Sequence, residues 1–384
     1  MFDHIVVGAG FAGAVFAREL ASVGKRVLII EKRNHVGGNC HDYFDEHGIL
    51  IHKYGPHLFH TSNSEVFHYL SRFTRWREYQ HRVLAEVDGK QVPIPFNLNS
   101  IEMLFPDKMA ARISGQLIDR FGFGSKVPIL ELLKTEEDDL HFLADFIYEK
   151  IFLNYTLKQW GCQPEDISSE VIGRVPVFIS RDDRYFQDKY QVVPMHGYTR
   201  LFENLLDHPG IHLLLNTNYR DVLAINVGDN PIRLFDCPFH GDLIYTGMID
   251  SLFGHRFGKL PYRSLDFRFE SLGQEYFQDA AVVNYPNNYD FTRITEFKRI
   301  SGQHSISTTI LREHPGHYDP SDKKRSIPCY PVLNDANMRL YEKYEKFAAQ
   351  INKIILLGRL AEYRYYDMDD IVARSLNVFK EKKL

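Results

Sequence analysis

The start of the chain restricts its fold more than any other segment. A short apolar run leads into the glycine-rich turn GAGFAG (residues 8–13), and a second apolar run, residues 27–30, ends at Glu31. This order of strand, turn, helix, strand and acid is typical of a dinucleotide-binding βαβ unit, in which glycines let the backbone approach a pyrophosphate. The acid accepts hydrogen bonds from ribose hydroxyls. A flexible turn without a ligand is the weaker interpretation, because strand, helix and acid all stand in the required places.

Two further segments favour FAD over a nicotinamide cofactor. A basic residue and a second glycine pair follow Glu31 in KRNHVGGN (residues 32–39), which brings more backbone to a large, permanently bound cofactor. Near the C-terminus the apolar run 354–357 ends in Gly-Arg, and a predicted helix over 369–379 follows. Such a turn and helix start suit a pyrophosphate or ribityl segment. These patterns give as cofactor-binding residues Gly8, Gly10, Gly13, Glu31, Lys32, Gly38, Asn39, Arg359, Tyr366, Asp367 and Met368.

Composition excludes several classes of protein. The 384 residues carry a formal net charge of −4, which implies no general attraction to nucleic acid. No apolar run reaches the roughly 18 residues of a membrane-spanning helix, and the N-terminus has no signal-peptide pattern. The four cysteines are widely spaced and read as free thiols of a reducing compartment. We therefore expect a cytoplasmic protein that binds neither nucleic acid nor membrane and holds no metal.

The predicted fold class is α/β, with a Rossmann-like FAD-binding domain, an inserted helical domain and an inserted antiparallel β-sheet domain. Alternating apolar residues around Asp88-Gly89 predict a hairpin, and a period of 3.6 predicts helices from Asn99 to Lys158. Alternation also predicts an antiparallel sheet from segments near 263–270, 279–285 and 305–312. The expected division is 1–80, 195–255 and 340–384 for the FAD-binding domain, 97–160 for the helical insert, and 81–96, 161–194 and 256–339 for the sheet domain.

Arginines and tyrosines recur in loop-like segments and are the candidates for ligand binding. Arg174 and Arg293 are well separated in sequence, and each offers several donors to a diphosphate. Tyr155 and Trp160 offer ring faces for a base, while tyrosines such as Tyr185 and Tyr365 offer hydroxyls to a polar ligand. Taken singly, each of these residues is explained as well by a surface salt bridge or a packed ring.

Taken together, these segments resemble the UDP-galactopyranose mutase family, flavoenzymes that interconvert the pyranose and furanose forms of a nucleotide sugar. The resemblance covers nearly the whole chain, and NYTLKQWG and GRLAEYRYYDMD are its most specific strings. The matching strings, in order, are GAGFAGAV, EKRNHVGGN, HKYGPHLFHT, PFNLNS, NYTLKQWG, RVPV, DDRYF, GYT, YTGMID, PYRSLDF, TRITEFK and GRLAEYRYYDMD.

The resemblance implies a redox-neutral isomerase that works only with reduced FAD. In that family N5 of the reduced flavin is thought to attack the anomeric carbon, giving a flavin–iminium intermediate. It also implies a nucleotide-sugar substrate, a flavin reductant such as NAD(P)H and a homodimer. The implied catalytic residues are Arg174, Arg293 and His57, with His57 expected under the flavin ring. Further implied contacts are Phe152, Tyr155, Thr156, Trp160, Tyr185, Asn284 and Tyr365 to substrate, and Phe11, His57, Leu58 and Ile371 to cofactor.

Two departures from the family pattern leave the sugar and base open. His81 stands where the galactose enzymes commonly have a substrate-facing Asn, and His314 stands where they have a tyrosine on the diphosphate. Both are predicted to contact substrate. A relative that acts on dTDP-fucopyranose has the same scaffold, so that sugar is the main alternative to UDP-galactopyranose. Two other interpretations are an FAD oxidoreductase of the amine-oxidase type and a flavin-bearing scaffold without activity.

Overall fold

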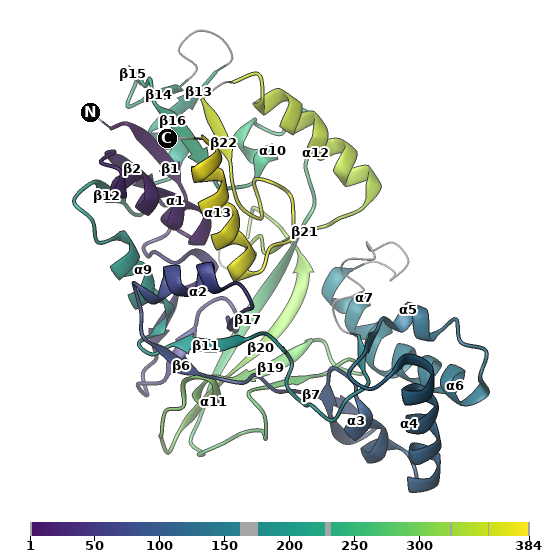
Figure 1. The fold of residues 1–384 in the computed structure, drawn as a ribbon. Coiled ribbons are helices and arrows are strands. Elements are labelled where there is room, and N and C mark those ends of the chain that lie inside the picture. The colour runs from purple at the N-terminus through teal and green to yellow at the C-terminus, as the bar shows by residue number, and fades with distance from the viewer. Residues whose placement is uncertain (1, 162–175, 227–231, 323–324, 352, 383–384) are drawn as a thin grey trace.

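A computed structural model describes residues 2–161, 176–226, 232–322, 325–351 and 353–382 of the chain. Figure 1 shows an α/β part that contains both termini and a helical part at the opposite end. Two long strands run between them, so that the two parts flank one large sheet. No helix in the described ranges is long and apolar enough to cross a membrane.

A parallel five-stranded sheet forms the centre of the α/β part. Its three inner strands are short and almost fully buried, which is usual when both faces of a parallel sheet are covered, and its two edge strands are more exposed. The register joins His4 to Val27 on one side and to Asp242 on the other. The strand order is β12 (Ile211–Leu214), β2 (Val27–Ile30), β1 (His4–Val7), β16 (Asp242–Tyr245) and β22 (Ile354–Leu356). This confirms the Rossmann-like unit that the first 31 residues predict.

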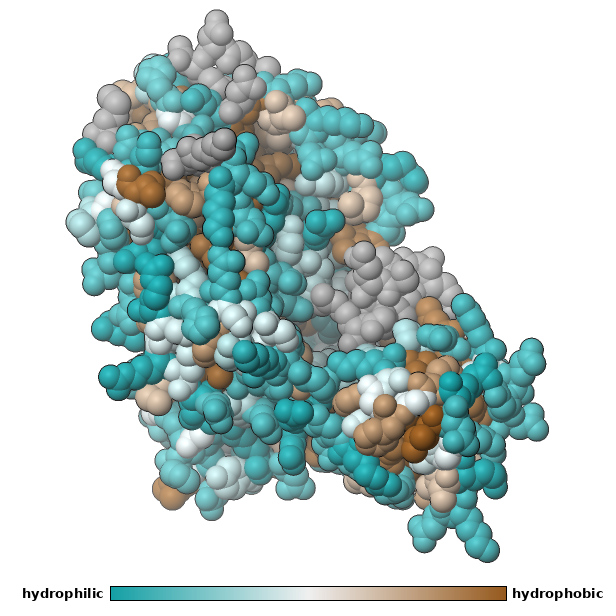
Figure 2. All heavy atoms as spheres, viewed as in Figure 1, coloured by the Kyte–Doolittle hydropathy of each residue, from teal (hydrophilic) through white to brown (hydrophobic). Residues whose placement is uncertain are grey.

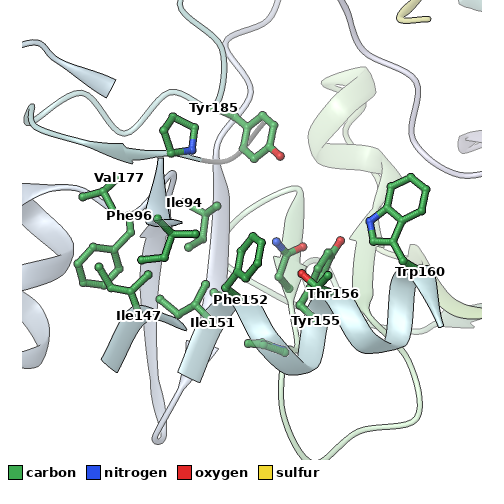
Figure 3. A pocket seen from close by; sticks show the side chains of 15 residues that line it. Ile94, Phe96, Ile147, Ile151, Phe152, Tyr155, Thr156, Trp160, Val177 and Tyr185 are labelled. Carbon is green, nitrogen blue, oxygen red and sulfur yellow. The ribbon is translucent and has the colours of Figure 1, made fainter. Parts of the chain in front are cut away.

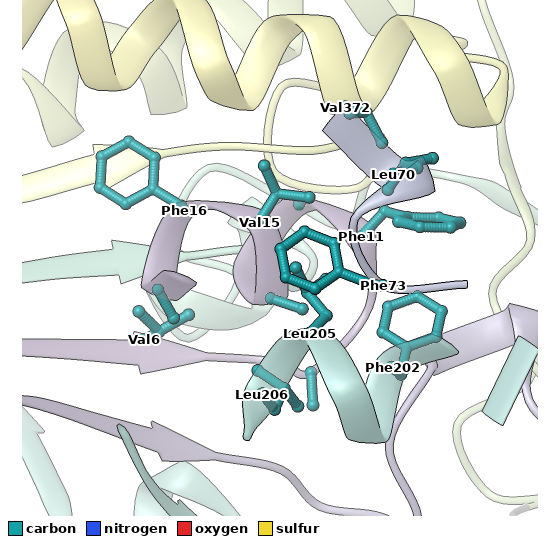
Figure 4. Packing of buried hydrophobic residues seen from close by; sticks show 14 of the residues in the cluster. Val6, Phe11, Val15, Phe16, Leu70, Phe73, Phe202, Leu205, Leu206 and Val372 are labelled. Carbon is teal, nitrogen blue, oxygen red and sulfur yellow. The ribbon is translucent and has the colours of Figure 1, made fainter. Parts of the chain in front are cut away.

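One face of this sheet is covered by three helices whose apolar sides meet (Figure 4). They are α1 (Phe11–Ser22), α9 (Gly197–Leu206) and α13 (Met368–Lys382). The Phe11 and Phe202 rings lie 4.5 Å apart, and Val372 of α13 is fully buried in the same cluster. The opposite face is covered by a small sheet of β13 (Leu223–Ile225), β14 (Ile232–Leu234) and β15 (Cys237–Pro238).

A seven-stranded sheet connects the two ends of the molecule. Its order is β21 (Tyr330–Pro331), β17 (Tyr262–Leu272), β20 (Thr308–His317), β19 (Arg293–Glu296), β18 (Val282–Asn284), β7 (Val83–Val87) and β8 (Lys90–Ile94). The predicted hairpin forms at β7 and β8, where Asp88 and Gly89 both have positive φ. The expectation of a purely antiparallel sheet is wrong at one place, because β18 pairs with β7 in parallel.

The helical part packs around its own apolar core. It comprises α3 (Leu98–Leu104), α4 (Asp107–Phe121), β9 (Lys126–Val127), α5 (Ile129–Leu132), α6 (Asp138–Ile147), the π-helical η2 (Tyr148–Leu153) and α7 (Asn154–Trp160). In Figure 2 the visible face is mostly hydrophilic, and apolar side chains gather over this part. Its exposed apolar residues include Met103, Ile118, Phe123, Leu130 and Phe142.

Smaller elements connect these units. A three-stranded sheet of β5 (Phe59–Thr61), β11 (Tyr190–Pro194) and β6 (Trp76–Glu78) lies beside α2 (Ser64–Ser71). The remaining elements are η1 (Gly38–Cys40), β3 (Asp42–Phe44), β4 (Leu50–His52), β10 (Val177–Phe178), η4 (Tyr219–Asp221), α10 (Ile249–Leu252), α11 (Phe297–Ser301) and α12 (Asp335–Ala348).

The segment 161–194, which the sequence assigns to the sheet domain, contributes to two other units where it is described. β10 pairs with β9, and its Val177 is buried in the core of the helical part. β11 pairs with β5 and β6 at the edge of the α/β part, where Val192 joins the core. Local alternation predicts such strands but not their partners, which lie about 50 residues away for β10 and more than a hundred residues away for β11.

Candidate functional site

Three glycine turns meet at the N-terminus of α1. A Cβ on Gly13 would lie 2.1 Å from the Gly8 carbonyl oxygen, so that this helix can start under the turn only with glycine there. A Cβ on Gly38 would lie 3.0 Å from Gly10 Cα, and one on Gly358 would lie 3.1 Å from Ala12 Cβ. The first turn of α1 carries no acidic residue. Close backbones and free helix N–H groups therefore form a cradle for an anion such as a pyrophosphate.

Glu31 lies at the end of β2, beside this cradle. Its Oε2 accepts a hydrogen bond from the Ala9 amide at 2.9 Å, and its Oε1 accepts one from the Arg33 amide at 2.9 Å. Each carboxylate oxygen keeps a second lone pair, so the oriented carboxylate can still accept hydrogen bonds from ribose hydroxyls. Arg33 also donates to Asn39 Oδ1 at 3.0 Å, which ties the second glycine turn to the first. These residues fit a dinucleotide.

Arg359 fixes the turn between β22 and α13. Its guanidinium donates to the carbonyls of Tyr366, at 2.5 Å, and Cys329, at 3.2 Å. The same guanidinium lies over the rings of Tyr330 and Tyr365, which are stacked 5.7 Å apart. A partly buried cation and two aromatic residues thus come together beside the start of α13.

A row of side chains crosses the large sheet and carries the charged centre of the candidate site. Asn284 pairs with Ala85 on one side and with Arg293 on the other, and Arg293 pairs with Glu313. Directly paired residues share a face of a sheet, so these four side chains lie side by side. At the far end of the row, a Cβ on Gly55 would meet Glu313 Oε1 at 3.2 Å, which places the loop before His57 over the carboxylate.

Arg293 and Glu313 form a buried ion pair. The distance from Arg293 Nε to Glu313 Oε1 is 2.8 Å, although the two groups are not aligned for a hydrogen bond. Burial by itself lowers the pKa of Arg293, and the Glu313 carboxylate raises it well above its usual value. The Glu313 side chain is fully buried, while that of Arg293 is 26% exposed. The cation is therefore permanently charged and partly accessible to a ligand.

A cavity lies next to this row, between the sheet and the helical part (Figure 3). Phe152 of η2 and Tyr155, Thr156 and Trp160 of α7 line it from the helical part. Asn284 lines it from the sheet, and Tyr185 lies on the side across from α7. Its inner end is apolar and is lined by Ile94, Phe96, Ile129, Ile147, Ile151 and Val177. The arrangement suits a flat ring with a polar edge.

Partly buried tyrosines surround the same space. Burial raises the pKa of Tyr155 and of Tyr185, and the Arg293 charge opposes that rise at both residues. The nearby Tyr365 hydroxyl also raises the pKa of both tyrosines. These phenols therefore stay protonated and can donate hydrogen bonds to phosphate oxygens.

Three histidines near the site are neutral. Burial lowers the pKa of His57 to about 3, with His52, Arg359 and Arg293 adding to the shift, and lowers that of His52 to about 4. His57 Nδ1 is 2.8 Å from the Gly55 carbonyl, which makes it the donor and leaves Nε2 as an acceptor. Burial also lowers the pKa of His81 to about 3, with Arg293 and His60 contributing. The His81 ring is in contact with Tyr185 and Phe186 and its Nδ1 is 3.2 Å from the Tyr79 hydroxyl.

The structure places several predicted residues differently from expectation. His314 follows Glu313 in β20 and so points to the opposite face of the sheet, where its Nδ1 is 3.4 Å from Asp290 Oδ2. It is not beside Arg293. Phe11 buries its ring in the core of α1, so only its main chain can face a cofactor. Lys32 is exposed. Arg174 lies outside the described residues.

Four more predicted residues lie near the His57 loop or the start of α13. Leu58 packs beside the core under the His57 loop, and Met368 and Ile371 pack at the start of α13. Asp367 precedes that helix, and its amide donates to Asp370 Oδ2 at 3.1 Å.

Sequence reasoning missed Glu313 and Tyr330. Glu313 could have been found because it is an acidic residue in a partly apolar strand. A buried acid of this kind predicts a cation on a neighbouring strand. No local pattern identifies Tyr330, since its place under Tyr365 depends on the pairing of β21 with β17. Among the described residues, no group of three or more His, Cys, Asp or Glu side chains is arranged to hold a metal ion.

Comparisons with known proteins show the family and the fold of this chain. The family profile described as UDP-galactopyranose mutase matches residues 150–365, and that of the NAD(P)-binding Rossmann-like domain matches residues 6–73. The chain is 37% identical over 380 residues to the UDP-galactopyranose mutase of Mycoplasma pneumoniae, covering 98% of this chain and 94% of that protein. It is 35% identical over 375 residues to the dTDP-fucopyranose mutase of Escherichia coli, covering 97% and 96%. A solved reduced UDP-galactopyranose mutase has a TM-score of 0.72 at 16% identity, covers 100% of this chain and 94% of that chain, and shows the shared fold.

The Rossmann-like fold, the glycine cradle and these comparisons define a flavin-dependent enzyme. The chain belongs to the UDP-galactopyranose mutase family and is an isomerase. Family membership overturns the two other interpretations, an amine-oxidase type of oxidoreductase and a scaffold without activity.

Proposed function

We propose that this enzyme interconverts UDP-galactopyranose and UDP-galactofuranose, with FAD as its cofactor and with the cofactor active when reduced. The observation that carries the proposal is the row Asn284–Arg293–Glu313, which ends at the aromatic cavity on one side and at the His57 loop on the other. A base in the cavity and a diphosphate on Arg293 would leave the sugar at the His57 loop.

The glycine cradle supports FAD as the dinucleotide. Gly8, Gly10 and Gly13 would face the pyrophosphate, Glu31 the ribose, and Gly38 and Asn39 the adjoining segment. Arg359 and the start of α13, from Tyr366 to Ile371, would hold the ribityl side. When bound and reduced, the isoalloxazine supplies an electron-rich nitrogen that can act as a nucleophile without net oxidation of substrate.

The residues of the chain bind and orient the nucleotide and stabilise charge. Phe152 and Tyr155 would stack on the base, with Thr156 and Trp160 at its edge and ribose. Arg293 would neutralise the diphosphate as it separates from the sugar, which is the kind of electrostatic stabilisation that contributes most in closed sites. Tyr185 and Tyr365 would donate hydrogen bonds to phosphate oxygens. Arg174 is proposed as a second cation from the sequence resemblance alone.

A dTDP-6-deoxy sugar is the second candidate substrate. Two observations favour it: the neutral His81 in place of an amide, and the apolar inner end of the cavity, which would accept the methyl group of thymine. The dTDP-fucopyranose mutase relative is also nearly as similar to this chain as the galactose enzyme.

A substrate comparison tests the proposal. We expect the dithionite-reduced enzyme to convert UDP-galactofuranose to the pyranose with the higher kcat/KM, measured by chromatography beside dTDP-fucofuranose. A higher value for dTDP-fucofuranose would transfer the proposal to the second candidate. Conversion of neither sugar would contradict both.

For partners, we propose a homodimer formed through the helical part, supported by the apolar side chains exposed there, such as Phe123 and Phe142. The flavin reductant in the cell is proposed to be a nicotinamide nucleotide.

A further inference from the structure

Lys158 joins helix α7 to the turn between β18 and β19. Its ammonium group donates to three backbone carbonyls of that turn, those of Tyr285 at 2.5 Å, Phe291 at 3.0 Å and Tyr289 at 3.2 Å. An ammonium group has three donors and no acceptor, so all of its hydrogen-bonding capacity is used on this one turn. Lys158 itself is partly buried.

A second connection runs between the same two segments. Asn154 Nδ2, at the start of α7, donates to Asn287 Oδ1 at 2.7 Å, and Asn287 Nδ2 donates to the Lys150 carbonyl at 2.6 Å. Asn287 lies in the middle of the turn that Lys158 holds. We call Lys158, Asn154 and Asn287 the latch. Asp290 is the acid of this turn, and His314 approaches it from β20.

The C-terminal end of α7 is fixed independently. Arg263 of β17 donates to the carbonyls of Lys158 and Gln159, both at 2.8 Å. These carbonyls belong to the last turn of the helix, where they lack helical partners. A Cβ on Gly161 would lie 2.5 Å from Arg263 Nη1, so the chain leaves the helix directly over the guanidinium. Only the latch, however, reaches the turn that carries Asn284 and Arg293 at its two ends.

We propose that Lys158 is a positioning residue that sets the distance between the base-binding helix and Arg293. Tyr155 and Thr156 lie within one turn of Lys158 on α7. Two of the three carbonyls that Lys158 holds belong to the residue after Asn284 and to the residue two before Arg293. A nucleotide that uses both ends of the site therefore depends on the latch, because sub-ångström placement of binding groups decides how well a rigid ligand is held. This inference rests on the proposed nucleotide site but not on the sugar or on the reaction.

Replacing Lys158 by methionine tests the inference. Methionine is also long and unbranched, but it removes all three donors. We expect the Kd for UDP, and for dTDP, to rise about tenfold and KM to rise with it, while kcat changes less than about threefold. That split is typical of an interaction made equally in ground and transition states. Kd is measured on the oxidised, FAD-loaded enzyme by quenching of tryptophan fluorescence, so no turnover is needed.

Two further variants complete the experiment. Lys150→Met is the matched control, because this lysine precedes the latch in η2 and its side chain pairs with the exposed Asp88, at 2.9 Å. The Kd of this variant should equal that of the unchanged enzyme. Asn287→Ala removes the second connection and should also raise Kd, which keeps the inference testable if Lys158→Met does not fold. A normal Kd in both latch variants, or an equal rise in Lys150→Met, would overturn it. If the Kd values change as expected but neither sugar is converted, the proposed function is wrong. The inference that Lys158 positions the nucleotide site is then still supported.

Discussion

Replacing Arg293 by alanine is expected to lower kcat by about 10²–10³-fold, the usual loss when one donor to a developing anion is removed from a closed site. Arg293 lies between the aromatic cavity and the His57 loop, in the part of the chain that the structure describes. Its charge lowers the pKa of His57, His81 and Tyr155, which surround it. The variant also leaves the buried Glu313 without its cation, which costs about 3–5 kcal/mol in such pairs. For this reason kcat is measured per folded, flavin-loaded enzyme, using the flavin absorbance.

Arg299 provides the matched control for this experiment. It also lies beside a fully buried glutamate, Glu296, at 3.1 Å, but away from the cavity. Glu296 keeps three other donors, including Thr308 Oγ1 at 2.6 Å, so Arg299→Ala should fold and retain near-normal kcat. A full rate in Arg293→Ala would contradict the role assigned to Arg293, as would equal losses in the two variants.

Replacing Gly13 by alanine is expected to give protein that is purified largely without flavin. The new Cβ would lie 2.1 Å from the Gly8 carbonyl oxygen and 2.9 Å from Val6 Cγ1. Both atoms belong to the strand and turn that form the cradle, so the backbone itself must shift. Overpacking of this kind commonly costs about 1–3 kcal/mol and here displaces the N–H groups that would face the pyrophosphate. The ratio of flavin to protein absorbance measures the effect.

Gly115 is the control for the alanine substitution. It is also a helical glycine, in α4, but a Cβ there would meet nothing within 4 Å. Gly115→Ala should retain full flavin content and stabilise the fold by about 0.5–1 kcal/mol, because alanine favours helix. Normal flavin content in Gly13→Ala would show that the cradle does not hold the cofactor.

Local sequence patterns predicted the elements that short-range physics determines. The turn at residues 8–13 and the acid at Glu31 predicted the βαβ unit, and Asp88-Gly89 predicted a hairpin. The predicted helix over 369–379 is also local, and it lies within α13. In each case the residues that define the element are neighbours in the chain.

The charged centre of the site could not be predicted in the same way. Glu313 faces Arg293 only because β19 and β20 pair in one particular register, and a shift by one residue would bring His314 to that face instead. The register therefore places His314 on the face opposite to Arg293, which no local pattern could predict. The latch is likewise formed by residues more than 120 positions apart, and the sequence holds no local sign of it.

The central claim is that the enzyme holds a nucleotide sugar beside a reduced flavin and isomerises it without consuming electrons. The most direct measurement counts the product molecules formed per flavin, with UDP-galactofuranose as substrate, in one sample that is first reduced with dithionite and then re-oxidised in air. The account predicts many turnovers per flavin after a single reduction and none after re-oxidation. Equal activity in the oxidised sample, or product limited to one molecule per added electron pair, would contradict it.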